Sequence, residues 1–388
     1  MSDVLDVVDA VTPGSAATVQ ANDAPEPALD FRLSNRVAIM TLNRPAVINA
    51  LSHEMVREMA SLVERCRSDR EIVAVVMRGA GVKGFCAGGD VRALYRAATL
   101  GYGNWREFFV DEYRLDFALH SLHKPLVALI DGVTMSGGMG LAQAASLRIV
   151  TERTCLAMPE ARIGFVPDVG ATRFLANLPV ELALYVALTG QSLTGADAIR
   201  YGLADAYAPG RSLQGFEKRL GMLDMDDVRQ SIRDVFVSPA NAVPPSEIVE
   251  FMPLIGEYFA ARSSVDEIVE SIECALRRER PVRERAWLQT TLDALLAGSP
   301  LMLNVTREAL LRGRAMSLAD CFRMEFDLAT RAIEVGDFCE GVRARMIDKD
   351  GAPRWMFRAL KDVNPAIVRR FHCAPSRVGP HPLADLGA

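Results

Sequence analysis

FCAGGD at residues 85–90 and MSGGMG at residues 135–140 are the stretches that decide the fold class of this 388-residue chain. Each follows an apolar run with the composition of a buried β-strand, IVAVVM at 72–77 and PLVALI at 125–130. Each also precedes a segment with helical character. Strands and helices that alternate through glycine-rich turns predict an α/β fold.

The two glycine-rich turns each place backbone N–H groups at the start of a helix, where the helix dipole favours negative charge. Neither turn matches GxGxxG or GxxxxGK[ST], which disfavours a dinucleotide site and a P-loop. Two interpretations remain. The turns are tight connections without chemistry, or one N–H from each meets at a single carbonyl oxygen and forms an oxyanion hole.

The remaining sequence divides the chain into three parts. Residues 1–29 are rich in Ala, Asp, Pro and Thr and contain no aromatic residue, which predicts a disordered tail. Residues 30–210 carry the α/β pattern, with order beginning near Phe31, and residues 211–388 are dominated by helical periods. Further expected features are strands at 36–42, 147–151 and 155–158, helix caps at Ser52 and Thr194, and helical stripes at Ile248/Met252/Ile255/Phe259, Leu303/Leu310/Leu311 and Leu318/Phe322/Phe326/Leu328.

Charge and cysteine content narrow the class of protein. The net charge of −5 argues against a nucleic-acid binder, and seven scattered cysteines without a CxxC pair argue against disulfides and a zinc site. No Lys or Arg precedes Arg32, which argues against a secretory or transit peptide. The uncharged stretch at 132–147 is too polar for a membrane span. The prediction is a cytoplasmic protein that contacts neither membrane nor nucleic acid.

Several motifs in order resemble one known family. Asn43–Leu51 (NRPAVINAL), Lys83–Asp90 (KGFCAGGD), Lys124–Gly140 (KPLVALIDGVTMSGGMG), Met158–Gly170 (MPEARIGFVPDVG) and Leu188–Ala204 (LTGQSLTGADAIRYGLA) are similar to the crotonase, or enoyl-CoA hydratase/isomerase, superfamily. The resemblance implies a crotonase-like ββα spiral core that binds an acyl-CoA thioester, followed here by a C-terminal helical region.

The resemblance also assigns candidate site residues. By motif position, the two N–H groups of the family's oxyanion hole fall on Gly89 and Gly137. Val91 and Arg92 match the segment that lines the CoA groove, and Arg92 is the candidate contact for the nucleotide phosphates. A solvated helix-surface arginine is the alternative interpretation of Arg92.

The branch of the family follows from three acidic positions. A hydratase carries one catalytic Glu where this chain has Gly140, whereas the second Glu is present as Glu160. Asp168 occurs where hydratases have Gly, and this pattern resembles the 3-hydroxyisobutyryl-CoA hydrolase branch, as does Glu112 at a substrate-contacting position. The C-terminal segments that carry the same resemblance are Met324–Leu328 (MEFDL), Asp337–Ala344 (DFCEGVRA) and Met346–Trp355 (MIDKDGAPRW).

The resemblance implies hydrolysis of 3-hydroxyisobutyryl-CoA, or a close β-hydroxyacyl-CoA, in valine catabolism. Glu160 would act as nucleophile or as base, Asp168 would position water or bind the substrate hydroxyl, and Glu112 would contact the acyl end. The structural alternatives are a helix-start carboxylate for Glu160, a turn residue for Asp168 and a solvated residue for Glu112. His120 and His123 are expected to be structural.

Two other functions stay open at this stage. One is hydration or isomerisation of another acyl-CoA, and the other is a non-catalytic CoA-binding protein. No metal or redox cofactor is implied, since coenzyme A is part of the substrate. The sequence leaves open whether the chain forms a homo-oligomer.

Overall fold

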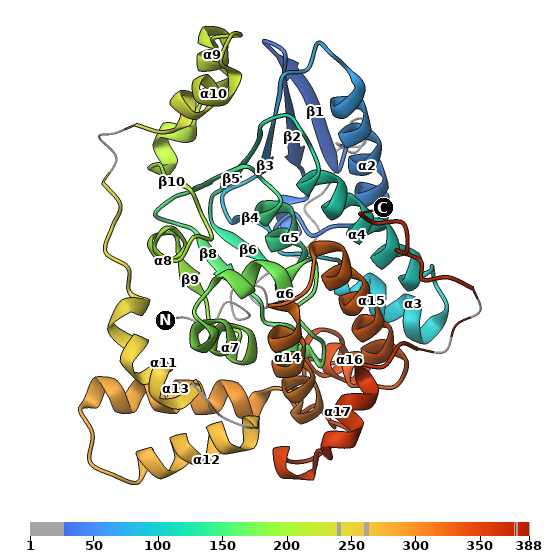
Figure 1. The fold of residues 1–388 in the computed structure, drawn as a ribbon, viewed down its shortest axis with the longest axis vertical. Helices are drawn as coiled ribbons and strands as arrows, with labels where there is room; N and C mark the ends of the chain where they lie inside the picture. The colour runs from blue at the N-terminus through green and yellow to red at the C-terminus, as the bar shows by residue number, and fades with distance from the viewer. Residues whose placement is uncertain (1–26, 239–241, 260–263, 376, 378, 388) are drawn as a thin grey trace, which may run out of the picture. The chain divides into compact units, whose positions relative to one another are not determined.

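The computed structural model describes residues 27–238, 242–259, 264–375, 377 and 379–387. The predicted disordered tail at 1–29 lies outside the described residues except for 27–29, and its last residue is ordered, because Leu29 is buried and begins the first strand, β1 (Leu29–Ser34). The described residues form two compact units, and most of their helices and strands are labelled in Figure 1. Unit 1 holds residues up to Asp90, Asp111–Ala157 and Ser192–Glu247, and unit 2 holds Val91–Val110, Met158–Gln191 and the residues from Ile248 onward.

Unit 1 contains a six-stranded sheet in the order β1-β2-β3-β5-β7-β10. The first pair is antiparallel and every other neighbouring pair is parallel. The predicted strands are present, and all five residues of β5 are buried, as the continuous apolar run predicts. The bounds are β1 (Leu29–Ser34), β2 (Val37–Leu42), β3 (Ala74–Gly79), β5 (Leu126–Ile130), β7 (Leu147–Val150) and β10 (Ala206–Tyr207).

A second sheet in unit 1 has the order β4-β6-β8-β9. Its strands are β4 (Gly84–Cys86), β6 (Val133–Met135), β8 (Cys155–Ala157) and β9 (Leu193–Thr194). The chain thus repeats two strands and a helix: β3, β4 and α3 (Val91–Leu100), then β5, β6 and α5 (Gly137–Gln143). Strands β1, β4, β6, β9 and β10 were not predicted. All of these except β1 have three residues or fewer, which is too few to show a strand period. Since β4 and β6 are parallel neighbours, both glycine-rich turns leave the same edge.

Two predicted helix caps in unit 1 are confirmed. The hydroxyl of Ser52 accepts a hydrogen bond from the backbone N–H of Met55 at the start of α2 (His53–Ser68). Thr194 and Asp197 form a reciprocal capping box at the start of α8 (Gly195–Arg200). Each cap stabilises its helix by about 1 kcal/mol.

Residues that follow the α/β pattern still pack on the six-stranded sheet. Phe216 of α9 (Phe216–Arg219) and Phe236 of α10 (Val228–Phe236) lie in one buried cluster with strand residues such as Val37 and Val76. Every described element after β10 is helical, as expected from residue 211 onward. The two compact units do not divide at residue 210, because unit 1 continues to Glu247. The boundary at 210 marks where strands give way to helices, and as a domain boundary it stays a prediction.

Unit 2 is built mainly from helices. Tyr185 stacks on Trp287 with ring centroids 5.4 Å apart and meets Phe259 edge-on, which joins three helices in one core. The predicted stripes lie on helices of this unit. The main helices are α7 (Val180–Thr189), α11 (Met252–Phe259), α12 (Val265–Leu276), α13 (Val282–Ala297), α14 (Pro300–Gly313), α15 (Leu318–Glu334), α16 (Phe338–Val342) and α17 (Pro365–Phe371).

Candidate active site

The first glycine-rich turn is held by a buried asparagine that sequence analysis did not single out. The Asn49 side-chain amide donates to the carbonyl oxygens of Ala80, Gly84 and Phe85 at 3.0–3.1 Å. Asn49 is fully buried. The backbone of the turn is also paired, since Leu51 N–H donates to the Gly88 carbonyl. The path of the chain through Gly88 and Gly89 is thus set by bonds from residues 44–51.

The second glycine-rich turn packs directly against the first. A Cβ atom on Gly88 would lie 2.6 Å from Cβ of Ser136, and one on Gly138 would lie 2.3 Å from the Cys86 carbonyl oxygen. Both approaches are closer than non-bonded atoms allow, so glycine is required for the two turns to meet.

The two candidate oxyanion-hole residues lie close together in unit 1. A Cβ atom on Gly137 would lie 3.4 Å from the backbone nitrogen of Gly89. Gly137 is the first residue of α5, so its N–H is among those without an acceptor inside the helix. Ser136 precedes it with φ of 50°. The structure therefore brings together the two positions that the resemblance assigns to one carbonyl oxygen.

A buried carboxylate lies beside this pair. Glu112, on the part of α4 (Trp105–His120) that belongs to unit 1, is 3% exposed. Its Oε1 atom would be 2.6 Å from a Cβ atom on Gly137. Asp116, one helical turn further on, is fully buried. The predicted alternative of a solvated surface position for Glu112 is wrong, because its helix face is covered.

Cys86 does not carry the properties of a nucleophile. Burial raises the pKa of its thiol to about 12, and the negative charges of Glu112 and Asp116 act in the same direction. The thiol is therefore neutral at physiological pH, whereas nucleophilic cysteines are thiolates. This agrees with an interpretation in which the first turn acts through its backbone.

Glu160 begins the short helix η2 (Glu160–Ile163) of unit 2 and is 2% exposed. The backbone of this helix is held from the C-terminal region. Ser299 N–H donates to the Ala161 carbonyl at 3.0 Å, and the Arg345 guanidinium donates to the Arg162 carbonyl at 2.8 Å. A Cβ atom on Gly341 would lie 2.3 Å from the Ile163 carbonyl oxygen. The C-terminal helical region, called the C-terminal extension below, is thus packed against the Glu160 helix.

Asp168 lies in a buried turn of unit 2 and is 4% exposed. Phe165 precedes it in the chain and has aromatic neighbours on both sides, Phe109 at 5.7 Å and Phe338 at 5.2 Å between ring centroids. Val169 follows with φ of 55°, a conformation that is rare for a β-branched residue. The Asp168 carbonyl accepts a hydrogen bond from Ala171 N–H at 2.8 Å.

Val91 and Arg92 are the first two residues of α3, and both are partly exposed. The candidate residues thus divide between the units. Gly89, Gly137 and Glu112 belong to unit 1, and Val91, Arg92, Glu160 and Asp168 belong to unit 2. Their assignment to one reaction stays a proposal.

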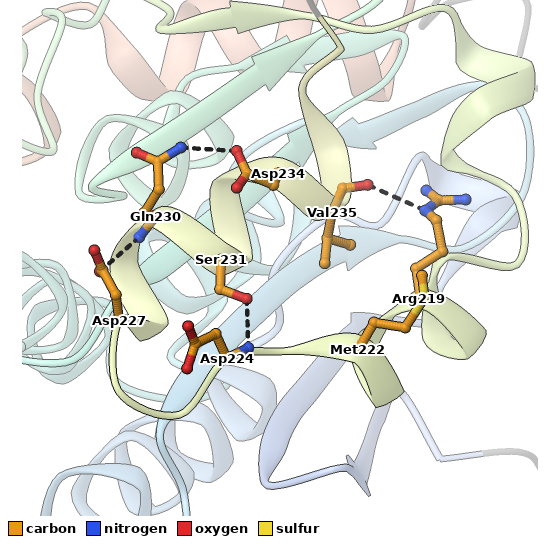
Figure 2. A pocket seen from close by; sticks show the side chains of 8 residues that line it. All are labelled: Arg219, Met222, Asp224, Asp227, Gln230, Ser231, Asp234 and Val235. Atoms are coloured by element: carbon orange, nitrogen blue, oxygen red, sulfur yellow. Dashed lines mark hydrogen bonds between the residues drawn. The ribbon is translucent and has the colours of Figure 1, made fainter.

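A pocket of about 440 Å³ in unit 1 is lined by none of these candidates (Figure 2). Its polar groups pair with one another: Gln230 donates to Asp234, and Arg219 donates to the Val235 carbonyl. These bonds tie α10 to its flanking turns. The lining residues are Arg219, Met222, Asp224, Asp227, Gln230, Ser231, Asp234 and Val235.

Comparison with known proteins tests the resemblance. A family model described as enoyl-CoA hydratase/isomerase matches residues 37–372. The chain belongs to the enoyl-CoA hydratase/isomerase family. The predicted crotonase-type fold is confirmed by a solved structure named as a carnitinyl-CoA dehydratase from Mycobacterium thermoresistibile, with 32% identity, a TM-score of 0.81, and coverage of 92% of this chain and 99% of that one.

Curated relatives of this family member include the predicted branch. A protein of Gallus gallus named "3-hydroxyisobutyryl-CoA hydrolase, mitochondrial" is 38% identical over 85% of this chain and 84% of its own length. An Arabidopsis thaliana protein named small ribosomal subunit protein mS47 is 37% identical over 88% of this chain and 82% of its own. The relative from Gallus gallus, which carries the hydrolase name, confirms the resemblance to the hydrolase branch.

The predicted cytoplasmic location is wrong, because the relative from Gallus gallus carries a mitochondrial name. The prediction relied on the acidic composition of residues 1–31, which argues only against import signals of the basic amphipathic type and does not determine the compartment. Among the described residues of this family member, no helix is both long and apolar enough to cross a bilayer. No cluster of three or more His, Cys, Asp or Glu in that same part of the chain could hold a metal ion.

Proposed function

We propose that this enoyl-CoA hydratase/isomerase family member hydrolyses the thioester of 3-hydroxyisobutyryl-CoA to 3-hydroxyisobutyrate and coenzyme A, a step of valine breakdown. The observation that carries the proposal is the contact between the two glycine turns, with Glu112 beside them. Gly88 and Gly138 have no room for a side chain, and the nitrogen of Gly89 lies close to Gly137. Backbone donors arranged in this way suit a developing thioester oxyanion.

The residue at position 140 favours hydrolysis over hydration. Gly140 lies within α5, where the resemblance places a catalytic Glu in hydratases. Addition of water to an alkene needs a proton acceptor and a proton donor at opposite ends of the reacting unit. Here glycine replaces one of the two carboxylates. A single carboxylate, Glu160, can attack a thioester carbonyl carbon or activate water for that attack, but it lacks the second group that addition of water to an alkene needs.

The proposed reaction begins with the substrate carbonyl oxygen accepting hydrogen bonds from Gly89 N–H and Gly137 N–H. In one route Glu160 attacks the carbonyl carbon, the C–S bond breaks, and the thiolate of coenzyme A takes a proton from water. Hydrolysis of the resulting mixed anhydride releases the hydroxy acid and regenerates the carboxylate. In the other route Glu160 accepts a proton from water as the water attacks, and that proton passes to the leaving sulfur.

Asp168 and Glu112 would serve the acyl group. The substrate carries a β-hydroxyl, which a carboxylate recognises as a hydrogen-bond acceptor. We assign this contact, or the positioning of water, to Asp168, and contact with the acyl end to Glu112. Arg92 at the start of α3 is the proposed partner of the nucleotide phosphates, since arginine suits phosphate recognition.

The test uses purified full-length protein with two substrates. With 3-hydroxyisobutyryl-CoA we expect release of free thiol, and with crotonyl-CoA we expect no loss of the alkene absorbance. Absence of thiol release from 3-hydroxyisobutyryl-CoA contradicts the hydrolase proposal. Alkene loss on the second favours a hydratase, and binding of CoA without either reaction favours a non-catalytic protein.

Glu160→Gln tests the central residue of the mechanism. The amide can neither attack a carbonyl as an anion nor accept a proton, so thiol release should fall by at least about 10²-fold. Glu270→Gln is the matched control, because Glu270 lies exposed on α12 and should leave the rate unchanged. An unchanged rate for Glu160→Gln would remove Glu160 from the mechanism. After a single turnover in ¹⁸O-labelled water, label in the Glu160 side chain identifies the anhydride route with attack of water on the Glu160 carbonyl of the anhydride, whereas the route of direct water attack puts label only in the hydroxy acid.

A further inference from the structure

One buried carboxylate of the C-terminal extension takes three hydrogen bonds from the turn that carries Asp168. Glu325 of α15 accepts from the N–H of Gly170 at 2.8 Å through Oε2. Its Oε1 accepts from the N–H of Thr172 at 2.9 Å and from the Thr172 hydroxyl at 2.6 Å. Glu325 and Thr172 are both fully buried. Both oxygens of one side chain are therefore committed to the turn.

The turn that these bonds hold is strained. Val169 has φ of 55° and Gly170 has φ of 84°, so two consecutive residues after Asp168 are left-handed. A non-glycine residue in this region costs on the order of 1–3 kcal/mol and persists only where its surroundings determine it. The N–H of Gly170 belongs to the peptide group that follows Val169. Its bond to Glu325 therefore acts on the backbone next to Asp168.

Helix α15 gives the carboxylate a rigid support. A Cβ atom on Gly170 would lie 3.4 Å from the Phe322 ring and 3.5 Å from the Leu318 side chain. Leu318, Phe322 and Glu325 are spaced to lie on one face of α15. Leu318 and Phe322 thus pack on the turn, and Glu325, on the same face of α15, accepts hydrogen bonds from it.

The position of Glu325 is costly, which argues that it does more than fill space. Burial raises the pKa of Glu325 to about 8, the bonds from Thr172 and Gly170 lower it, and the negative charge of Asp168 raises it. Burying a carboxyl group is unfavourable unless its hydrogen bonds are satisfied. An apolar residue of similar volume would avoid this cost but could not accept from the turn.

We propose that Glu325 is a positioning residue whose side chain holds the Asp168 turn in the conformation that the reaction uses. This inference rests on the proposed function in assigning Asp168 to the site. It gives the C-terminal extension a role in the chemistry, because α15 supplies the acceptor that the strained turn requires. Displacement of a catalytic group by about 1 Å costs up to about 10²-fold in rate.

The test compares variants of the full chain at the two partners of these bonds, Glu325 of α15 and Thr172 of α6 (Ala171–Phe174). Glu325→Gln keeps the shape but presents an amide to the N–H donors, so kcat should fall about 10- to 100-fold with KM changed less than about threefold. Thr172→Val replaces the donating hydroxyl by a methyl group and leaves the two backbone bonds, so it should lower kcat less than Glu325→Gln, and Thr172→Ser, which keeps the hydroxyl, should retain the parent kcat. Asp327→Asn is the matched control, since Asp327 of α15 pairs with Arg377 and not with the turn.

Amide hydrogen exchange at residues 168–172 supplies a second measurement. We expect faster exchange in Glu325→Gln and unchanged exchange in Asp327→Asn. A kcat within twofold of the parent for Glu325→Gln overturns the proposal, as does an equal loss in Asp327→Asn. If Glu325→Gln does not fold, the Thr172 variants decide. A kcat within twofold of the parent for Thr172→Val, or an equal loss for Thr172→Ser, then overturns the proposal. Absence of thiol release in the parent protein refutes the proposed function instead, and the exchange comparison then still shows whether Glu325 holds the turn.

Discussion

Substitution of Gly137 by alanine is the sharpest perturbation that the structure offers. The added methyl group would lie 2.6 Å from Oε1 of Glu112 and 3.4 Å from both Gly88 Cα and Gly89 N. The backbone itself tolerates alanine, because Gly137 is not in a left-handed conformation. The methyl would therefore occupy the space beside the two N–H groups without unfolding α5.

The expected cost follows from the loss of one oxyanion donor. Obstructing Gly137 N–H should lower kcat by about 10²- to 10³-fold, which corresponds to about 2.7–4 kcal/mol in the barrier. Overpacking against Glu112 should lower the free energy of unfolding by about 1–3 kcal/mol, and the better helix propensity of alanine offsets part of this. Activity should thus fall far more than stability.

The assay follows free thiol from 3-hydroxyisobutyryl-CoA together with urea unfolding of the same preparations. Gly256→Ala is the matched control, because a Cβ atom on Gly256 in α11 meets no atom within 4 Å. The double variant Gly137→Ala/Glu112→Ala removes the crowding carboxylate. Relative to Glu112→Ala alone it should still lose at least about tenfold in kcat. Parent-like kcat for Gly137→Ala would refute the assignment of Gly137 as an oxyanion donor.

Three further outcomes are expected. Asp168→Asn should lower kcat/KM for 3-hydroxyisobutyryl-CoA about tenfold or more, and comparison with isobutyryl-CoA shows whether the hydroxyl contact is responsible; equal losses on both substrates would argue for water positioning. Asn49→Ala should lower the free energy of unfolding by about 3 kcal/mol or more, measured in urea, because it leaves two buried carbonyl oxygens and one partly buried carbonyl oxygen without this donor. Burial lowers the pKa of His120 from 6.5 to about 4, so the unfolded chain takes up the proton first as pH falls from 6.5 to 4. The parent should therefore lose roughly 3 kcal/mol over that range that His120→Asn retains, and equal losses in urea titrations would contradict this.

Local patterns predicted much of the fold. The apolar runs at β3 and β5, the caps at Ser52 and Thr194, and the stripe on α15 each depend on neighbours within a few residues. Strands β4 and β6 could not be predicted in this way, since each has three residues and exists because it pairs with a strand distant in the sequence.

Some residues of the candidate site were also predicted from local sequence, and others were not. Motif positions were sufficient to nominate Gly89, Gly137, Glu160, Asp168 and Glu112. Asn49 and Glu325 were missed as individuals, although both lie in segments that carry the family resemblance. Their roles depend on partners 31–36 and 153–155 residues away in the chain. An Asn in a turn and a Glu in a charged helix give no local signal that they are buried.

The sequence alone determined the fold class, the family and its hydrolase branch, because these are encoded in residue types at fixed spacings along the chain. Tertiary structure decided which glycines have no room for a side chain, that Glu112 lies beside Gly137, and that Glu325 accepts from the turn of Asp168. The physical reason is that steric exclusion, burial and hydrogen bonding act between atoms that are near in space, whatever their separation in sequence.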